Sequence, residues 1–265
     1  MERPADMVLD AFASKRLIGS LSASDPSLDE RRAYEVAAEV HARRMERGEQ
    51  PVGRKIGFTN RTTWPQFGIW EPIWGYVYDS TVSYARDGEA RVAIDPFIQP
   101  RIEPEIQLHF AQAPPVTRDE AELVACIDWI ALGFEIVQCP YPDWRFSAAD
   151  AIAACAIHGA LVVGERVPVA GLDDCAAKLR GFTVELCRND ELELTGAAAN
   201  VLDGPLLAFG HLTEVLASQA GAPPIREGEV VTTGTLTDVL PVKPGETWSV
   251  TALGIELPDL SLAIE

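Results

Sequence analysis

The sequence predicts an α+β protein in which a helical segment over residues 1–50 precedes a β-rich body over residues 51–265. Three observations support this class: apolar residues at helical spacing before Gly48, a change of composition after it, and strand-like alternation further along. The chain has 265 residues, of which 47% are hydrophobic, enough for one large folded unit. We see no repeat, low-complexity tract or interdomain linker, so the body is expected to be one continuous unit.

The helical segment is predicted from two stretches. Residues 27–48 have four apolar residues at the spacing of one helix face: Ala33, Val36, Ala37 and Val40. Ser27 and Glu30 match a capping box at the start, and Gly48 is a typical stop. A weaker helix is expected over residues 5–18.

The β-rich body is predicted from turn residues and short alternating runs. Residues 51–100 are rich in Gly, Pro and Trp, which is typical of strands joined by functional loops. Inside the body we expect two strands and two helices: strands at 100–110 and 132–138, and helices at 117–130 and 205–220. Thr117 and Glu120 would cap the first helix. From Gly228 onward the chain is expected to be strand and turn.

Composition and charge exclude several classes of partner. The chain has 22 Lys and Arg against 40 Asp and Glu, a net charge of -18, so nucleic-acid phosphates would be repelled. No apolar run approaches the roughly 18 residues of a membrane span, and the N-terminus lacks the basic region of a signal peptide. Five cysteines without a C-x-x-C pair are typical of reduced thiols. We therefore expect a cytoplasmic protein without nucleic-acid or membrane partners.

Two carboxylates stand one residue apart in the strand expected at 100–110. Its apolar residues occupy even positions and face a core: Ile102, Ile106, Leu108 and Phe110. Glu103 and Glu105 then project together on the other face. Their repulsion requires a shared proton, a basic side chain such as Arg101, or a metal ion, unless the acidic edge is solvated. The stretch by itself leaves these alternatives open.

A third carboxylate in the strand expected at 132–138 favours the metal. Glu135 is a lone charge among apolar residues, and such residues are rarely buried unless they are paired. Together with Glu103 and Glu105 it would form an all-oxygen site, which suits Mg²⁺ or Mn²⁺ rather than zinc.

Six segments resemble motifs of the 2-keto-4-pentenoate hydratase family, in the same order, over most of the chain. They are GRKIGFTN (53–60), GIWEPIWGYVYD (68–79), PRIEPEIQLHF (100–110), GFEIVQCPYPDW (133–144), TGAAANVLDGPLLAFGHL (195–212) and GEVVTTGTLTDVLPVKPGE (228–246). The family also holds 4-oxalocrotonate decarboxylases and belongs to the fumarylacetoacetate hydrolase superfamily. The resemblance implies a fumarylacetoacetate hydrolase-like body, a mixed β-sandwich roll. It also implies that Glu103, Glu105 and Glu135 hold Mg²⁺ or Mn²⁺.

The resemblance also implies two catalytic residues. Lys55, in GRKIG, matches the family's lysine near the active site and would orient the substrate carboxylate or assist proton transfer. Without the resemblance it would be a solvated loop residue. Asp79 lies near the family's acidic position after E-P-x-x-G, so it is either a catalytic acid or base or a turn residue.

Four further residues are expected at the substrate. Thr235 and Thr237 match a strand end that faces substrate in the family, although their hydroxyls could equally serve a turn. Arg101 is the second candidate cation, after Lys55, for an anionic substrate. Gln138 follows Glu135 closely and is expected to contact substrate.

One departure from the family pattern leaves the reaction open. Ala154 and Cys155 stand where these hydratases usually have Asp-Asn, and His158 nearby either substitutes for them in part or is a core histidine. The resemblance implies a homo-oligomeric enzyme acting on a small 2-oxo or 2-hydroxydienoic acid. Hydration of a 2-hydroxy-2,4-dienoate is expected first, as in aromatic catabolism. Decarboxylation of a 4-oxalocrotonate-like acid comes second and C–C hydrolysis of a diketo acid third. A catalytically inactive assembly subunit is the alternative from another class.

Overall fold

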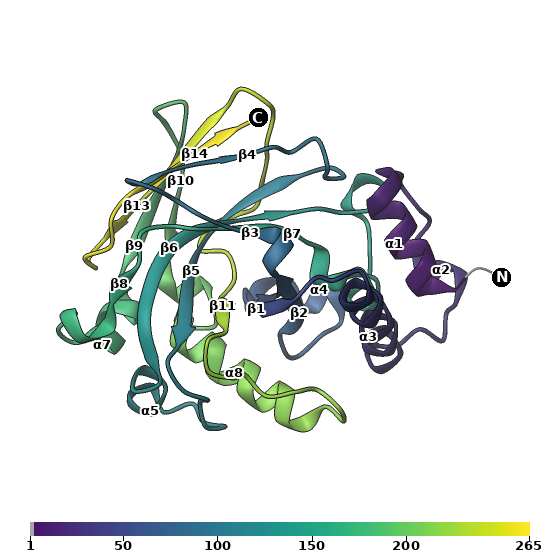
Figure 1. Cartoon of the computed structure of the whole chain (residues 1–265), viewed down its shortest axis with the longest axis horizontal. Coiled ribbons are helices and arrows are strands. Elements are labelled where there is room, and N and C mark those ends of the chain that lie inside the picture. Colours follow the sequence, from purple (N-terminus) through teal and green to yellow (C-terminus); the bar gives the residue numbers. More distant parts are fainter. Residues whose placement is uncertain (1–2) are drawn as a thin grey trace.

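The computed structural model describes residues 3–265 as an N-terminal group of helices beside a body of two sheets (Figure 1). The predicted segment over residues 1–50 therefore includes two residues that lie outside the described part. Within residues 3–265, no helix combines the length and the apolar character needed to cross a bilayer. The α+β class predicted from the sequence is confirmed.

Three helices form the N-terminal group: α1 (Pro4–Ser14), α2 (Leu21–Ser24) and α3 (Glu30–Glu46). Helix α3 confirms the helix predicted at 27–48, but the capping box predicted there is wrong. Asp29 is the cap, since its carboxylate accepts a hydrogen bond from the Arg32 backbone N–H at 2.8 Å. Helix α1 ends earlier than expected because Lys15 adopts a left-handed conformation with φ of 54°.

The larger sheet has nine strands and curls. Its strands are β1 (Pro51–Gly57), β2 (Ile73–Tyr78), β3 (Val82–Tyr84), β5 (Arg101–Phe110), β6 (Ile127–Val137), β7 (His158–Val163), β8 (Val167–Pro168), β11 (Val230–Thr232) and β12 (Leu240–Pro241). The main order is β2-β1-β11-β5-β6-β7-β3, with β12 beside β5 and β8 beside β6. Strand β2 also contacts β7, so the sheet encloses an inner face.

The smaller sheet packs against the larger one. Its order is β10-β9-β13-β14-β4, and its strands are β4 (Glu89–Val92), β9 (Thr183–Arg188), β10 (Glu191–Ala197), β13 (Thr247–Leu253) and β14 (Leu260–Ile264). One hydrophobic cluster joins the sheets and includes Leu132 and Phe134 from β6 and Trp248 and Leu262 from the smaller sheet. The body is therefore two packed sheets, as in a sandwich.

Five further α-helices and six 3-10 turns connect the strands. The helices are α4 (Trp64–Phe67), α5 (Glu120–Val124), α6 (Ala148–Ala153), α7 (Cys175–Gly181) and α8 (Pro205–Ser218). The 3-10 turns are η1 (Arg61–Thr63), η2 (Asp79–Thr81), η3 (Pro142–Trp144), η4 (Cys155–Ile157), η5 (Val169–Gly171) and η6 (Ala198–Asn200). Helix α8 confirms the helix predicted at 205–220. It packs on β5, where the rings of Phe110 and Phe209 lie 4.5 Å apart.

The helix predicted at 117–130 is largely wrong. Helix α5 covers only five residues and is capped by Asp119 rather than Thr117. Strand β6 begins at Ile127, which pairs with Phe110 on β5. Pairing with a long neighbouring strand overrides the local helical pattern here, as tertiary context often does. Strand β6 is consequently much longer than the strand expected at 132–138.

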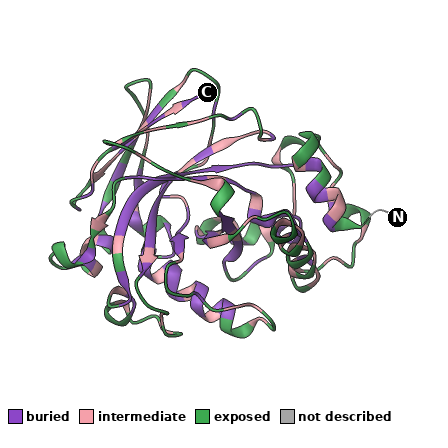
Figure 2. Cartoon of the chain, in the orientation of Figure 1, coloured by how far each residue is buried: buried purple, intermediate pink, exposed green. Residues whose placement is uncertain are grey.

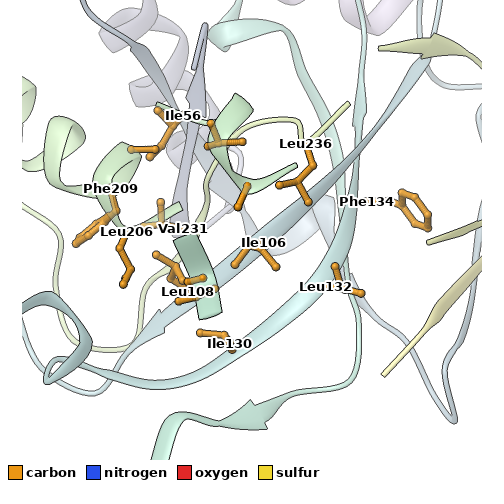
Figure 3. Packing of buried hydrophobic residues seen from close by; sticks show 14 of the residues in the cluster. Ile56, Ile106, Leu108, Ile130, Leu132, Phe134, Leu206, Phe209, Val231 and Leu236 are labelled. Carbon is orange, nitrogen blue, oxygen red and sulfur yellow. The ribbon is translucent and has the colours of Figure 1, made fainter. Parts of the chain in front are cut away.

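Both faces of β5 are buried, and this positions the candidate site (Figure 2). Its even-numbered residues, among them Ile106 and Leu108, join the large hydrophobic cluster with α8 (Figure 3). Its odd-numbered residues face the inside of the curl. A second cluster of apolar residues lies on that inner face: Val77, Ala131, Leu161, Val163 and Val230. A charged residue at an odd position of β5 is therefore placed in the interior, where an unpaired charge is costly.

Candidate metal centre

The register between β5 and β6 brings the three glutamates together. Glu103 pairs directly with Glu135, and Glu105 pairs with Gly133. One carboxylate oxygen from each glutamate lies within 4.8 Å of the others. A hard divalent cation has ligand distances of roughly 2.0–2.6 Å, so three oxygens at this separation can share one ion.

Burial makes this cluster difficult to ionise without a counter-charge. Glu105 and Glu135 are fully buried, and Glu103 is half-buried. Burial, with a further contribution from Glu135, raises the pKa of Glu103 to about 7. Burial and the two neighbouring carboxylates raise the pKa of Glu105 well above its ordinary value.

Lys55 supplies one positive charge from β1. Its side chain is buried, and Nζ lies 3.0 Å from Glu135 Oε2. Burial by itself would lower the pKa of Lys55, but the three carboxylates, Glu135 first, outweigh burial and hold that pKa above its ordinary value. In the opposite sense, burial would raise the pKa of Glu135, but Lys55 and His158 hold it below its ordinary value.

The cluster fits a divalent cation by its charge and by a buried carboxylate oxygen that has no partner. When all three carboxylates are ionised, they and the Lys55 ammonium carry three negative charges and one positive charge, a sum of -2 that one divalent ion neutralises. Glu105 Oε1 is buried and accepts no hydrogen bond within residues 3–265, and Glu135 Oε2 is engaged by the Lys55 ammonium at 3.0 Å. Buried polar atoms are nearly always satisfied, so Glu105 Oε1 indicates a missing partner.

Strand β11 and the turn after it hold Glu105 in place. The Thr232 hydroxyl and the Gly234 backbone N–H, the latter at 2.8 Å, both donate to Glu105 Oε2. These bonds fix one oxygen and leave Oε1 free. The sequence reasoning missed Thr232, choosing Thr235 and Thr237 in the same TTGTLT run. Only the pairing of β11 with β1 and β5 reveals which threonine reaches the carboxylates.

His158 holds the other end of Glu135. Its Nδ1 lies 2.7 Å from Glu135 Oε1, and its Nε2 lies 2.9 Å from Thr81 Oγ1. Burial lowers the pKa of His158, which favours the neutral ring. A neutral ring satisfies both contacts if Nδ1–H donates to the carboxylate and Nε2 accepts from Thr81. The sequence signal was a lone histidine in an apolar run; its contact with Glu135 required the structure.

Ala154 and Cys155, where the sequence departs from the family pattern, lie three to four residues before His158. Cys155, Ala156 and Ile157 have φ values of 58°, 51° and 56°, so the chain turns through a left-handed run between α6 and β7. The carbonyl oxygen of Cys155 lies against Gly75, where a Cβ would come within 2.7 Å of it. This turn delivers the His158 side chain, rather than the side chains of Ala154 and Cys155, to the carboxylates.

Two residues that the sequence predicts at the site, Asp79 and Arg101, have other partners in the structure. Asp79 is exposed, and its Oδ1 accepts hydrogen bonds from the backbone N–H groups of Gln50 and Ser80 at 3.0 and 2.8 Å. It therefore serves as a turn residue in this structure, and a catalytic role for Asp79 stays a prediction. The Arg101 guanidinium lies 4.2 Å from the centre of the Trp144 ring and forms no ion pair with Glu103 within residues 3–265.

The remaining expected substrate contacts are engaged with backbone. The Gln138 amide donates to His158 O at 3.3 Å and accepts from Ile98 N–H at 3.4 Å. Thr235 Oγ1 donates to Thr237 O at 3.0 Å, and Thr237 Oγ1 donates onward to Asp238 O at 3.0 Å. These bonds are those of a turn, so substrate contact by these three residues stays a prediction.

Sequence comparison places the chain among known enzymes. No model of a protein family matches it. A 2-keto-4-pentenoate hydratase from Paraburkholderia xenovorans is 31% identical over 248 residues, which are 92% of this chain and 88% of that protein. The chain belongs to the 2-keto-4-pentenoate hydratase family. This confirms the family that was predicted from the sequence motifs, PRIEPEIQLHF among them.

Solved structures extend the comparison. The chain is similar to a 4-oxalocrotonate decarboxylase from Pseudomonas putida G7, complexed with magnesium and adipate, with a TM-score of 0.88 and 26% identity over 99% of this chain and 96% of that one. A protein from Oleispira antarctica described as a fumarylacetoacetate isomerase/hydrolase has a TM-score of 0.58 at 17% identity, covering 81% of this chain and 94% of that one. The latter likeness concerns the fold alone. The fold of this 2-keto-4-pentenoate hydratase family member is that of the fumarylacetoacetate hydrolase superfamily.

Proposed function

We propose that the protein is a metal-dependent hydro-lyase that adds water to a 2-hydroxy-2,4-dienoate to give a 4-hydroxy-2-oxo acid. The observation that carries this proposal is the buried cluster of Glu103, Glu105 and Glu135 beside Lys55, in a chain 31% identical to a 2-keto-4-pentenoate hydratase. A dead assembly subunit would have no reason to keep an excess of buried negative charge.

The three glutamates would hold the cation, which we expect to be Mg²⁺ or Mn²⁺ because all three ligands are hard oxygens. A related solved structure is described with magnesium, which supports a divalent ion here. When bound, the cation supplies Lewis acidity toward the carboxylate and 2-oxo oxygens of the substrate. The protein's own side chains would orient the substrate and the metal ligands and transfer protons.

Lys55 is the side chain best placed to meet an anionic substrate. The reaction moves the proton of the 2-hydroxyl group to C5, and then adds water with its oxygen at C4 and a proton at C3. Lys55 carries a proton at Nζ within the carboxylate cluster, since the glutamates raise its pKa. We assign to it the orientation of the substrate carboxylate and the transfer of a proton.

His158 and Thr232 would hold the ligands rather than react. His158 orients one oxygen of Glu135, and Thr232 orients one oxygen of Glu105, so that the second oxygen of each carboxylate is left for the cation and for Lys55. Such partners around metal ligands fix their orientation and raise affinity. We assign to them positioning roles.

Decarboxylation is the second candidate because the similar solved structure with a TM-score of 0.88 is a 4-oxalocrotonate decarboxylase. C–C hydrolysis is less favoured. The N-terminal histidine that could serve as its base, His41, is hydrogen-bonded to the Tyr78 hydroxyl at 2.8 Å and stacked on Tyr76. A cytoplasmic location and a homo-oligomeric state remain predictions of the sequence.

A direct assay tests the proposal. Purified full-length protein with Mn²⁺ would be incubated separately with 2-hydroxypenta-2,4-dienoate and with 4-oxalocrotonate, and the products identified by NMR. We expect 4-hydroxy-2-oxopentanoate from the first and little carbon dioxide from the second. Faster carbon dioxide release than hydration would replace hydratase by decarboxylase. No turnover of either compound, in protein shown to bind Mn²⁺, would contradict both.

A further inference from the structure

Gln107 is a buried side chain whose amide has no hydrogen-bond partner in the part of the chain that the structure describes. It lies on β5 at the next odd position after Glu103 and Glu105, so it shares their face. Its side chain is fully buried, and neither Nε2 nor Oε1 forms a hydrogen bond within residues 3–265. Burying an amide without a hydrogen bond costs free energy, so a ligand at this position would offset a real penalty.

The glycine on the neighbouring strand shows where the amide lies. A Cβ built on Gly133 would overlap the carboxamide of Gln107, including both of its polar atoms. Gly133 pairs with Glu105 and stands two residues before Glu135 on the same face. The amide therefore lies in the space between the strands that is flanked by these two metal-ligand candidates.

The neighbours of Gln107 offer its amide few free polar groups. Ala131, its partner across β6, belongs to the apolar cluster of the inner face. Thr232, its partner across β11, already donates its hydroxyl to Glu105. Along β5, His109 on one side is paired with Asp128, and Glu105 on the other side has an Oε1 without a hydrogen-bond partner within residues 3–265. The unsatisfied atoms of Glu105 and Gln107 thus belong to neighbouring side chains on the same face of β5.

We infer that Gln107 is a fourth protein residue of the cation site, whose carboxamide makes polar contact with the oxygen shell of the cation. This inference rests on the proposed metal site and deepens it. Gln107 acts as a positioning residue at the inner end of the site, where β5 runs on into the apolar cluster. Gly133 is required beside it because any side chain there would displace the amide.

The test is calorimetric titration of Mn²⁺ into metal-free full-length protein, together with thermal unfolding of the same samples. In Gln107→Leu we expect the dissociation constant for Mn²⁺ to rise about tenfold or more, the scale for groups around metal ligands. We expect the metal-free Tm to stay level or rise, because the substitution removes an unsatisfied buried amide. If Gln107 only filled space, Gln107→Leu would leave the dissociation constant for Mn²⁺ unchanged. Metal affinity and metal-free Tm would then not change in opposite senses.

A glutamine with a satisfied amide provides the matched control. Gln219 accepts a hydrogen bond from Trp74 Nε1 at 2.8 Å, at the far end of α8. Gln219→Leu is expected to lower the Tm and to leave Mn²⁺ affinity unchanged.

Gly133→Ala keeps the inference testable if Gln107→Leu fails to fold. It should weaken Mn²⁺ binding in the wild-type background but add little in a Gln107→Ala background, because the amide it displaces is then absent. Equal weakening in both backgrounds would show that Gly133 acts without Gln107, and would overturn the inference.

The outcomes separate this inference from the proposed function. Wild-type protein that binds Mn²⁺ and turns over the dienoate, while Gln107→Leu binds Mn²⁺ within twofold of wild type, would overturn the inference alone. It would mean that the amide holds a structural water. Wild-type protein that binds no Mn²⁺ would overturn both.

Discussion

Arg54 and Lys55 are neighbours on β1, and each is only 3% exposed, yet their surroundings differ. Successive residues of a strand point to opposite faces. Arg54 meets a single carboxylate, with its Nη1 2.6 Å from Glu229 Oε2, and its guanidinium lies 4.0 Å from the centre of the Tyr76 ring. Lys55 points into the curl and meets three carboxylates.

The difference lies in charge balance. The Arg54–Glu229 pair is neutral as it stands, and the Tyr76 ring covers the guanidinium, while Arg54 Nε has no hydrogen-bond partner within residues 3–265. With its three glutamates ionised, the cluster around Lys55 retains two excess negative charges, and Glu105 Oε1 has no hydrogen-bond partner within residues 3–265. Burial and perturbed pKa values occur at both places, so neither property identifies a functional site here. The unbalanced charge does, and four predictions test that contrast.

Removal of divalent metal should have the largest effect. Exhaustive chelation is expected to abolish turnover of the dienoate, and Mg²⁺ or Mn²⁺ should restore it, because the excess charge around Lys55 otherwise repels an anionic substrate. The restored ion should also raise the Tm, since it binds only the folded state. Full activity in protein shown to be metal-free would remove the distinction between the two regions.

Arg54→Leu should reduce stability rather than chemistry. Removing one partner of a buried ion pair leaves Glu229 uncompensated, so we expect the free energy of unfolding in urea to fall by about 3–5 kcal/mol. Mn²⁺ affinity of the folded variant should be unchanged. A variant of wild-type stability that no longer binds Mn²⁺ would show that this pair belongs to the metal site.

Lys55→Ala should reduce catalysis rather than stability. We expect kcat/KM to fall about 10²-fold, the scale of a lost acid–base group. Mn²⁺ binding should not weaken, because the cluster then carries three negative charges. Arg101→Ala, whose guanidinium stacks on Trp144, is expected to cost less. Near-normal kcat/KM in Lys55→Ala with an inactive Arg101→Ala would reverse the two roles.

His158→Leu should have the smallest effect of the four. Glu135 Oε1 would lose its donor, so the dissociation constant for Mn²⁺ is expected to rise about tenfold in a calorimetric titration. Thr81→Val, which removes only the contact to His158 Nε2, should change it less. An unchanged dissociation constant in His158→Leu would mean that the histidine merely fills the core.

The sequence determined much of the secondary structure that carries the site. Strand β5 and helices α3 and α8 follow from local periodicity, and the period of two placed Glu103 and Glu105 on one face. The family motifs identified Lys55. These properties depend on residues close together in the chain, so the sequence suffices to predict them.

The tertiary structure decided which distant groups meet. The register of β5 with β6 sets Glu103 opposite Glu135 and converts the predicted helix at 117–130 partly into strand. Because β11 pairs with β5, Thr232 rather than Thr235 contacts Glu105. A left-handed turn places His158 against Glu135. Curling of the sheet buries the odd face of β5, where a solvated acidic edge had been an alternative. Register and curvature depend on pairing between residues far apart in the chain, which no local pattern encodes.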